Sequence, residues 1–226
     1  MANNKVNGKQ MTVVRNVDDL QISHGNGDTV DALIKKLIER YGNQEYLTIH
    51  QGKVHEYLGM KLDYCEQGRV KIDMTGYLKN ILVDLPDKYL GMAITPVAKN
   101  VFEVNDTARK LRKKDVQGFH NAVTKLLFLC KRFRPDILTG VTFLTTRVRD
   151  PNKDDNNKLS RTLKYLSSTK DLVLTLESVS TRTVKWWVGT AFLVHHDMKS
   201  HTGGIMLTRK GYLYSAAKKI EHEELN

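Results

Sequence analysis

The sequence predicts an α+β fold, in which strands and helices occupy separate stretches of the chain. Apolar and polar residues alternate near 11–22 and 58–74, which is typical of half-buried strands in hairpins. Between 119 and 166 the apolar residues recur at helical spacing instead. With 226 residues and a hydrophobic fraction of 40%, the chain is long and apolar enough to bury a core.

The first predicted hairpin places two adjacent carboxylates in its turn. Apolar half-strands at 11–14 and 20–22 flank a short polar segment that contains Asp18 and Asp19. Carboxylates at a rigid turn suit a hard cation such as Mg²⁺, and two ions about 3.5–4 Å apart would activate a 3′-hydroxyl. That chemistry needs a further carboxylate from another strand. The alternative is an ordinary turn, because aspartate favours turns.

A helix and a second hairpin follow. Apolar residues at helical spacing predict a helix over 30–41, which Asp28 is expected to cap and Gly42 to end. The alternating pattern of 58–74 predicts the second hairpin. A short helix then runs to Pro86, which stops it.

The middle of the chain is expected to be helical after a linker. Residues 87–116 are rich in charge and show no period, which predicts a linker. A helix is expected from Phe119, and the sequence at 134–136 breaks it because proline lacks an N–H and clashes with the preceding turn. After a polar loop over 150–157, the spacing predicts another helix over 159–166.

The last part of the chain predicts short strands at 172–176 and 186–188, and a loop at 200–204. The adjacent tryptophans Trp186 and Trp187 could stack a nucleic-acid base, but the ordinary interpretation is one ring in the core and one at the surface. Three histidines fit no zinc spacing and are interpreted as loop or surface residues: His195, His196 and His201.

The net charge of +11 is concentrated in one region. Residues 107–170 hold 16 Lys and Arg against 5 Asp and Glu, so the rest of the chain is balanced. A local basic surplus predicts a polyanion such as nucleic acid as the partner, and the alternative is a solvated helical face. The candidate nucleic-acid-binding residues are Arg132, Arg134, Arg147, Arg149, Lys158, Arg161 and Lys164.

The remaining composition predicts an intracellular protein, cytoplasmic or nuclear. Cys65 and Cys130 lie far apart and offer neither a disulfide framework nor a metal spacing. No apolar run approaches the roughly 18 residues that suggest a membrane span, so no membrane partner is expected.

Several segments, in order, resemble the Ty1/copia class of retrotransposon polyproteins. The turn segment 13–20 resembles the polymerase motif Tyr-Val-Asp-Asp, and 56–60 resembles the Phe-Leu-Gly segment that helps to hold the primer. Residues 134–137 match the Arg-Pro-Asp-Ile run of the connection helices. The segments 164–172 and 199–204 resemble the stretch that leads to RNase H and its early hairpin.

This resemblance implies an RNA-directed DNA polymerase with RNase H as the parent enzyme, an RNA or DNA template-primer as partner, and Mg²⁺ as cofactor. The implied segments are a partial reverse-transcriptase palm and thumb over 1–86, a linker over 87–116, a helical connection over 117–178 and a truncated RNase H-like sheet over 179–226. Asp18 and Asp19 would be the catalytic metal ligands. The primer-grip-like residues would be Tyr57, Leu58 and Gly59.

The sequence departs from the family at its active-site positions. Asn16 replaces the family's tyrosine, no Asp or Glu precedes Asp18, and Gly189 stands where the first RNase H carboxylate is expected. The late acidic residues Glu221, Glu223 and Glu224 lack the family's context. We therefore expect the fingers and most of the palm to lie outside these residues, and the chain alone to be inactive as a polymerase.

Uncovered sheet edges would then favour association. Two alternatives stay open: a non-enzymatic, basic nucleic-acid-binding fragment, and a decayed element with no selected function.

Overall fold

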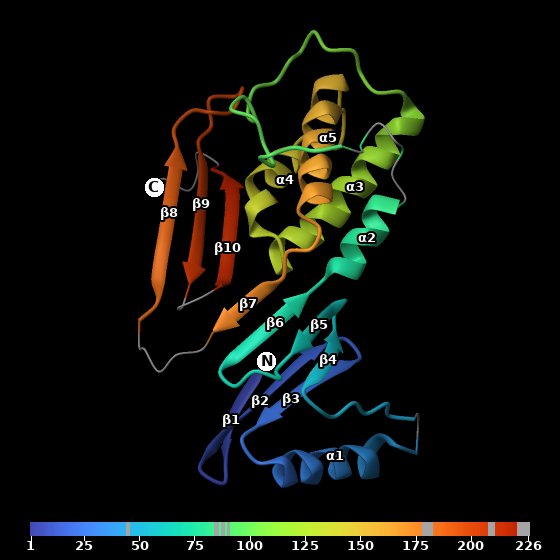
Figure 1. The fold of residues 1–226 in the computed structure, drawn as a ribbon, viewed down its shortest axis with the longest axis vertical. Coiled ribbons are helices and arrows are strands. Elements are labelled where there is room, and N and C mark those ends of the chain that lie inside the picture. The colour runs from blue at the N-terminus through green and yellow to red at the C-terminus, as the bar shows by residue number, and fades with distance from the viewer. Residues whose placement is uncertain are drawn as a thin grey trace. The chain divides into compact units, whose positions relative to one another are not determined.

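The computed structural model divides the chain into two compact units, Met1–Leu58 and Gly59–Asn226. It describes residues 1–43, 46–83, 86, 89, 91–177, 183–207 and 211–220. The predicted α+β class is confirmed, because both units combine helices with antiparallel strand pairs (Figure 1).

The first unit is a three-stranded sheet with one helix. The sheet has the order β1-β2-β3. The strand β4 (Val54–Tyr57), which is not part of this sheet, ends the unit. Its strands are β1 (Ala2–Val6), β2 (Lys9–Asn16) and β3 (Asp19–His24). The predicted hairpin is confirmed, since Val13 pairs with Ile22 across β2 and β3.

Helix α1 (Gly27–Tyr41) follows the hairpin, as the periodicity predicted, and Gly42 ends it. The predicted cap is wrong: the N-cap is Asn26, whose side-chain oxygen accepts a hydrogen bond from the Asp28 N–H at 2.8 Å. Asp28 instead lies in the first turn, where its charge stabilises the helix dipole. The apolar row of α1 is only half-buried, and Met11 is the one buried apolar side chain among the described residues of this unit.

The second unit contains two further antiparallel sheets. In one, β5 (Met60–Asp63) and β6 (Arg69–Asp73) form the second predicted hairpin, and β7 (Leu174–Glu177) pairs with β6. Arg69 lies opposite Glu177, and their charged groups approach to 3.6 Å. The short strand near 172–176 is therefore confirmed.

The other sheet has the order β10-β9-β8. Its strands are β8 (Lys185–Ala191), β9 (His201–Leu207) and β10 (Tyr212–Lys219). The strand at 186–188 is confirmed, but the loop predicted at 200–204 is wrong. Residues 201–204 belong to β9, which pairs with β8 and β10 on its two sides, and these ladders outweigh the weak strand preference of glycine.

The helices of the second unit share one hydrophobic core. They are α2 (Thr75–Val83), α3 (Lys113–Arg132), α4 (Leu138–Thr145) and α5 (Lys153–Ser168), with a 3₁₀ turn at Pro135–Ile137. The break at 134–136 is confirmed. Helix α3 begins six residues before Phe119, and α5 begins inside the expected polar loop because Asn152 and Asp155 form a capping box.

The stretch expected to be a linker is packed against the core in its described part. Residues 91–112 form no helix or strand apart from one bridge between Lys110 and Asn152. Val101 is buried, and Phe102 and Leu111 pack against the helices. Irregular backbone, as charge and lack of period indicated, is found over 91–112, but residues 113–116 of the expected linker belong to α3, and the contact with the core was not predicted.

The interpretation of the histidines as loop or surface residues is wrong for His201, which begins β9 and is buried. His195 lies in the loop between β8 and β9, as expected, but it is buried as well. His195 and His201 are each 5% exposed, and their Nε2 and Nδ1 atoms share a hydrogen bond of 3.1 Å. Phe102 packs against both rings, at centroid distances of 5.0 and 4.8 Å. Burial, with a contribution from His195, lowers the pKa of His201 to about 4.

This pair predicts an acid-sensitive fold. A neutral imidazole that titrates near 4 in the folded chain and near 6.5 in the unfolded chain stabilises the fold fully above pH 6.5, and this contribution is lost as the pH falls toward 4. We expect the free energy of unfolding, measured by urea titration, to drop by about 2 kcal/mol between pH 7 and 5. His201→Leu should flatten this slope, and His120→Leu, on the exposed side of α3, should not. If the free energy of unfolding of His201→Leu depended on pH as steeply as that of the parent chain, His201 would not be the source of the acid sensitivity.

A two-residue turn at the candidate metal site

The two carboxylates lie at the tip of the β2–β3 hairpin. Asn16 pairs with Asp19, so Val17 and Asp18 form the two-residue turn. Val17 has a φ of 50° and is 82% exposed. A β-branched residue rarely adopts this left-handed conformation, which costs about 1–3 kcal/mol and occurs preferentially at functional sites. The turn therefore carries backbone strain beside both acidic side chains.

The described residues do not complete a metal centre at this turn. Asp18 and Asp19 are both exposed, and no group of three His, Cys, Asp or Glu side chains in the described part of the chain could hold a metal ion. One or two carboxylates can hold Mg²⁺ together with substrate phosphate oxygens, but a two-metal site needs more. The late acidic residues 221, 223 and 224 lie outside the described residues.

The primer-grip-like residues form a tight turn. Tyr57 ends β4 and is half-buried, and the next two residues both have positive φ, 52° at Leu58 and 72° at Gly59. Such a pair of angles is typical of the two-residue turns that join hairpin strands. The boundary between the two units falls within this turn.

Arg134 lies inside the second unit, although its charge suggested a nucleic-acid contact. It is 3% exposed, its Nη2 lies 2.7 Å from the Asp136 carboxylate, and its Nη1 donates to the Thr169 carbonyl at 3.0 Å. Burial alone would raise the pKa of Asp136, but hydrogen bonds from Arg134 and Tyr165 and the Arg134 charge hold it below its ordinary value. Arg134 thus joins the α3–α4 turn to the end of α5.

Most of the other predicted basic residues also have partners within the protein. Arg147 pairs with buried Asp155 at 3.2 Å. Lys158 pairs with Asp154 at 2.9 Å and donates to the Glu103 carbonyl. Arg132 lies over the Phe128 ring at 3.8 Å. Arg161 donates to the Thr95 hydroxyl at 2.8 Å. Lys164 is half-buried near Gly91.

An exposed basic cluster remains at the start of α5, where the chain brings four residues together. Arg149 is exposed, and the Lys153 N–H donates to the Arg109 carbonyl at 2.9 Å. The backbone of Lys110 forms a β-bridge with Asn152, and its side chain forms an ion pair with Asp150 at 2.5 Å. We call Arg109, Lys110, Arg149 and Lys153 the basic cluster. Only Arg149 was predicted, because the contact between 109–110 and 152–153 is non-local.

The charge of the basic cluster comes from its side chains. The first N–H groups of helix α5 already donate inside the protein, from Lys153 to the Arg109 carbonyl and from Asp154 and Asp155 to the Asn152 side chain. The two acidic residues of this helix face internal partners, since Asp155 pairs with Arg147 and Asp154 with Lys158. The cluster therefore favours an anion.

Comparison with known proteins gives one similar curated protein, from Saccharomyces cerevisiae and named after transposon Ty5-1. It is 24% identical over 197 residues, which is 86% of this chain. The chain spans 61% of the length of that protein. No family model matches, and no solved structure matches. The similarity supports a retrotransposon-derived origin for the chain.

The Arg134 network predicts a stability effect. Removing the guanidinium with Arg134→Ala leaves Asp136 without its cationic partner and the Thr169 carbonyl without this donor, so the free energy of unfolding should fall by about 2–4 kcal/mol. Arg149→Ala, which removes the same charge from the surface, should change it by less than about 0.5 kcal/mol. Chemical denaturation measures both. Equal stability of the two variants would contradict the structural role of Arg134.

Proposed function

We propose that the chain is a nucleic-acid-binding fragment of a Ty1/copia-type reverse transcriptase whose polymerase site is incomplete. The observation that supports this most is the strained turn at Val17, with Asp18 and Asp19 beside it. The hairpin lies at the position where the ordered sequence motifs expect the polymerase turn. The similarity to a transposon-named protein supports the same origin.

The basic cluster is the proposed contact with the template-primer. Its side chains extend from the start of α5 and from the segment before α3, and phosphate oxygens accept hydrogen bonds from arginine and lysine. Phosphate contacts carry no sequence information, so binding should show little sequence preference. An intracellular location accords with this partner and with two cysteines that are not joined in a disulfide, Cys65 and Cys130.

Catalysis by these residues alone is not expected. Mg²⁺ bound by Asp18 and Asp19 would supply a Lewis acid for the primer hydroxyl, but a two-metal site needs at least one further carboxylate. Asn16 pairs with Asp19 and cannot offer the aromatic ring of the family, and Gly189 in β8 has no carboxylate. These two substitutions also favour a second candidate, a decayed element without selected function. An intact reading frame encoding the palm next to the gene would argue against decay.

The proposed function predicts binding of nucleic acid. A labelled RNA/DNA primer-template should bind the chain in fluorescence anisotropy, with an affinity that falls by about tenfold or more between 50 and 200 mM salt. The double variant R149A/K153A should weaken binding about fivefold or more at 50 mM salt. The control K35A/K36A removes the same charge from exposed positions of α1. No binding at 50 mM salt, or equal losses in both variants, would overturn the proposal.

The second prediction concerns chemistry. With Mg²⁺, deoxynucleotides and an annealed primer-template, the purified chain should extend no primer, because the described residues bring two carboxylates, Asp18 and Asp19, to the turn and no third His, Cys, Asp or Glu. Denaturing gels resolve single-nucleotide addition. Extension that disappears in D18N/D19N would show that the site is complete and would refute the proposed inactivity.

A further inference from the structure

The sheet formed by β8, β9 and β10 has one face packed on helices and one face without a described cover. Tyr212 and Ala217 point to the same side, since Tyr212 pairs with Leu207 and Ala217 with Gly203. Tyr212 is buried, and Ala217 packs against the helical core. The opposite face carries the alternate residues of each strand, and we call it the open face.

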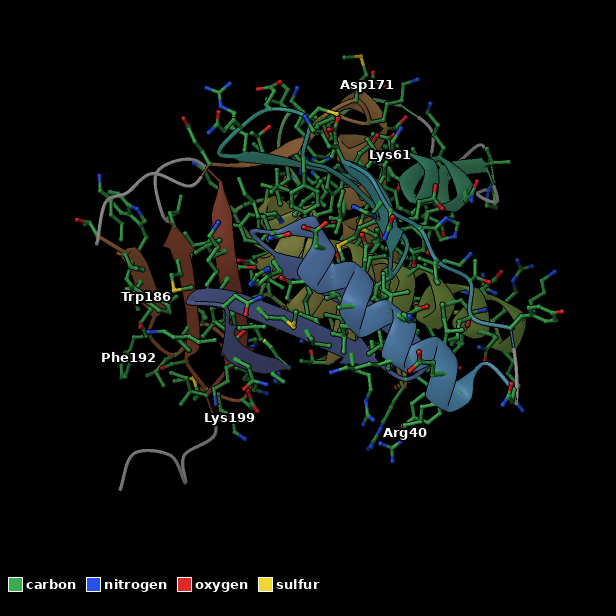
Figure 2. The ribbon with its side chains drawn as sticks, turned by 90° about the horizontal axis from the view of Figure 1, so that it is seen from below. Arg40, Lys61, Asp171, Trp186, Phe192 and Lys199 are labelled. Atoms are coloured by element: carbon green, nitrogen blue, oxygen red, sulfur yellow. The ribbon has the colours of Figure 1, made fainter. Side chains whose placement is uncertain are left out.

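One row of the open face is aromatic. Trp186 pairs with Met206, and Met206 pairs with Tyr214, so the three side chains form a row across all three strands. Trp186 is 56% exposed and Tyr214 is 52% exposed, and their ring centroids lie 6.3 Å apart. β8 is the strand farthest from α3 and α4 (Figure 1), and Trp186 projects from it (Figure 2).

This exposure differs from the expectation for two adjacent tryptophans. Trp187 lies on the other face and is 68% exposed, so neither ring belongs to the core. Val188, next to Trp186 on the open face, is 73% exposed. Exposed aromatic side chains in neighbouring strands are costly in water and typically mark a binding surface.

The charge of this sheet suits a polyanion. The three strands contain Lys185, Lys218 and Lys219 and no Asp or Glu. Lys218 lies on the open face, where it pairs with Thr202, two residues along β10 from Ala216. The nearest carboxylate in the connecting loop, Asp197, pairs with Lys219 at 2.5 Å. An acidic protein surface would also be attracted, but planar aromatic rings on a face that also carries a lysine, Lys218, suit bases joined by phosphates.

We propose that the open face binds single-stranded nucleic acid by stacking bases on Trp186 and Tyr214, with Lys218 near the phosphates. Unpaired bases expose their π faces, whereas duplex bases are already stacked, so the face should prefer single strands. The inference rests on the proposed function for the nature of the ligand. It names a second surface, which shares no residue with the basic cluster.

The test compares two fluorescent probes of equal length, oligo-dT and a DNA duplex, at 200 mM salt, where phosphate contacts are weakened. W186A and Y214A should each reduce oligo-dT affinity about fivefold or more and leave duplex affinity unchanged. W187A, which removes an exposed ring from the other face, is the matched control and should have less than a twofold effect. Circular dichroism checks that each variant is folded.

The outcomes separate this inference from the proposed function. R149A/K153A should weaken the binding of both probes and keep the preference for oligo-dT, whereas W186A/Y214A should abolish that preference. Unchanged preference in W186A/Y214A would overturn the inference and leave the basic cluster as the binding surface. Sedimentation that shows dimers of the parent chain and monomers of W186A/Y214A, with oligo-dT affinity unchanged, would assign the face to a second copy and also overturn the inference.

Discussion

The burial of α3 against α4 and α5 is the constraint on which the second unit depends. Leu126, Val141 and Leu163, one from each helix, are fully buried, and each such side chain contributes about 1.5–3 kcal/mol. The segment before α3 adds Val101 to this core, and β10 adds Ala217. The same packing therefore holds the basic cluster at the start of α5 and the aromatic row of the open face, so both proposed surfaces need an intact core.

Local patterns predicted much of this fold. The spacing of apolar residues is enough for α1 and α5, and alternation is enough for the hairpins, because these elements depend on neighbours in the chain. One strong local signal was missed: Asn7-Gly8, both with positive φ, joins β1 to β2. Non-local contacts explain the other errors. Pairing on both sides makes residues 201–204 a strand, and Phe102 from an irregular segment buries His195 beside His201.

For the candidate sites too, local sequence predicted some features, and only the folded structure revealed the others. Asp18 and Asp19 were placed at a turn from the sequence, but the strain at Val17 is a backbone property that residue types did not reveal. Charge alone identified a basic region, yet burial decides what each residue does: Arg134 is an internal support, and Arg149 is exposed. The sequence alone cannot separate these two roles, because only the structure shows that the Arg134 guanidinium donates a hydrogen bond to the Thr169 carbonyl.

The most direct test of the central claim is to find where nucleic acid touches the chain. A primer-template that carries a photoreactive base or backbone analogue can be cross-linked at 50 mM salt, and mass spectrometry then identifies the attached peptides. The account predicts cross-links in the peptides that contain Arg109 and Arg149, at the start of α5 and in the segment that pairs with it. Cross-links confined to residues 1–58, or spread evenly over the lysines of both units, would contradict it.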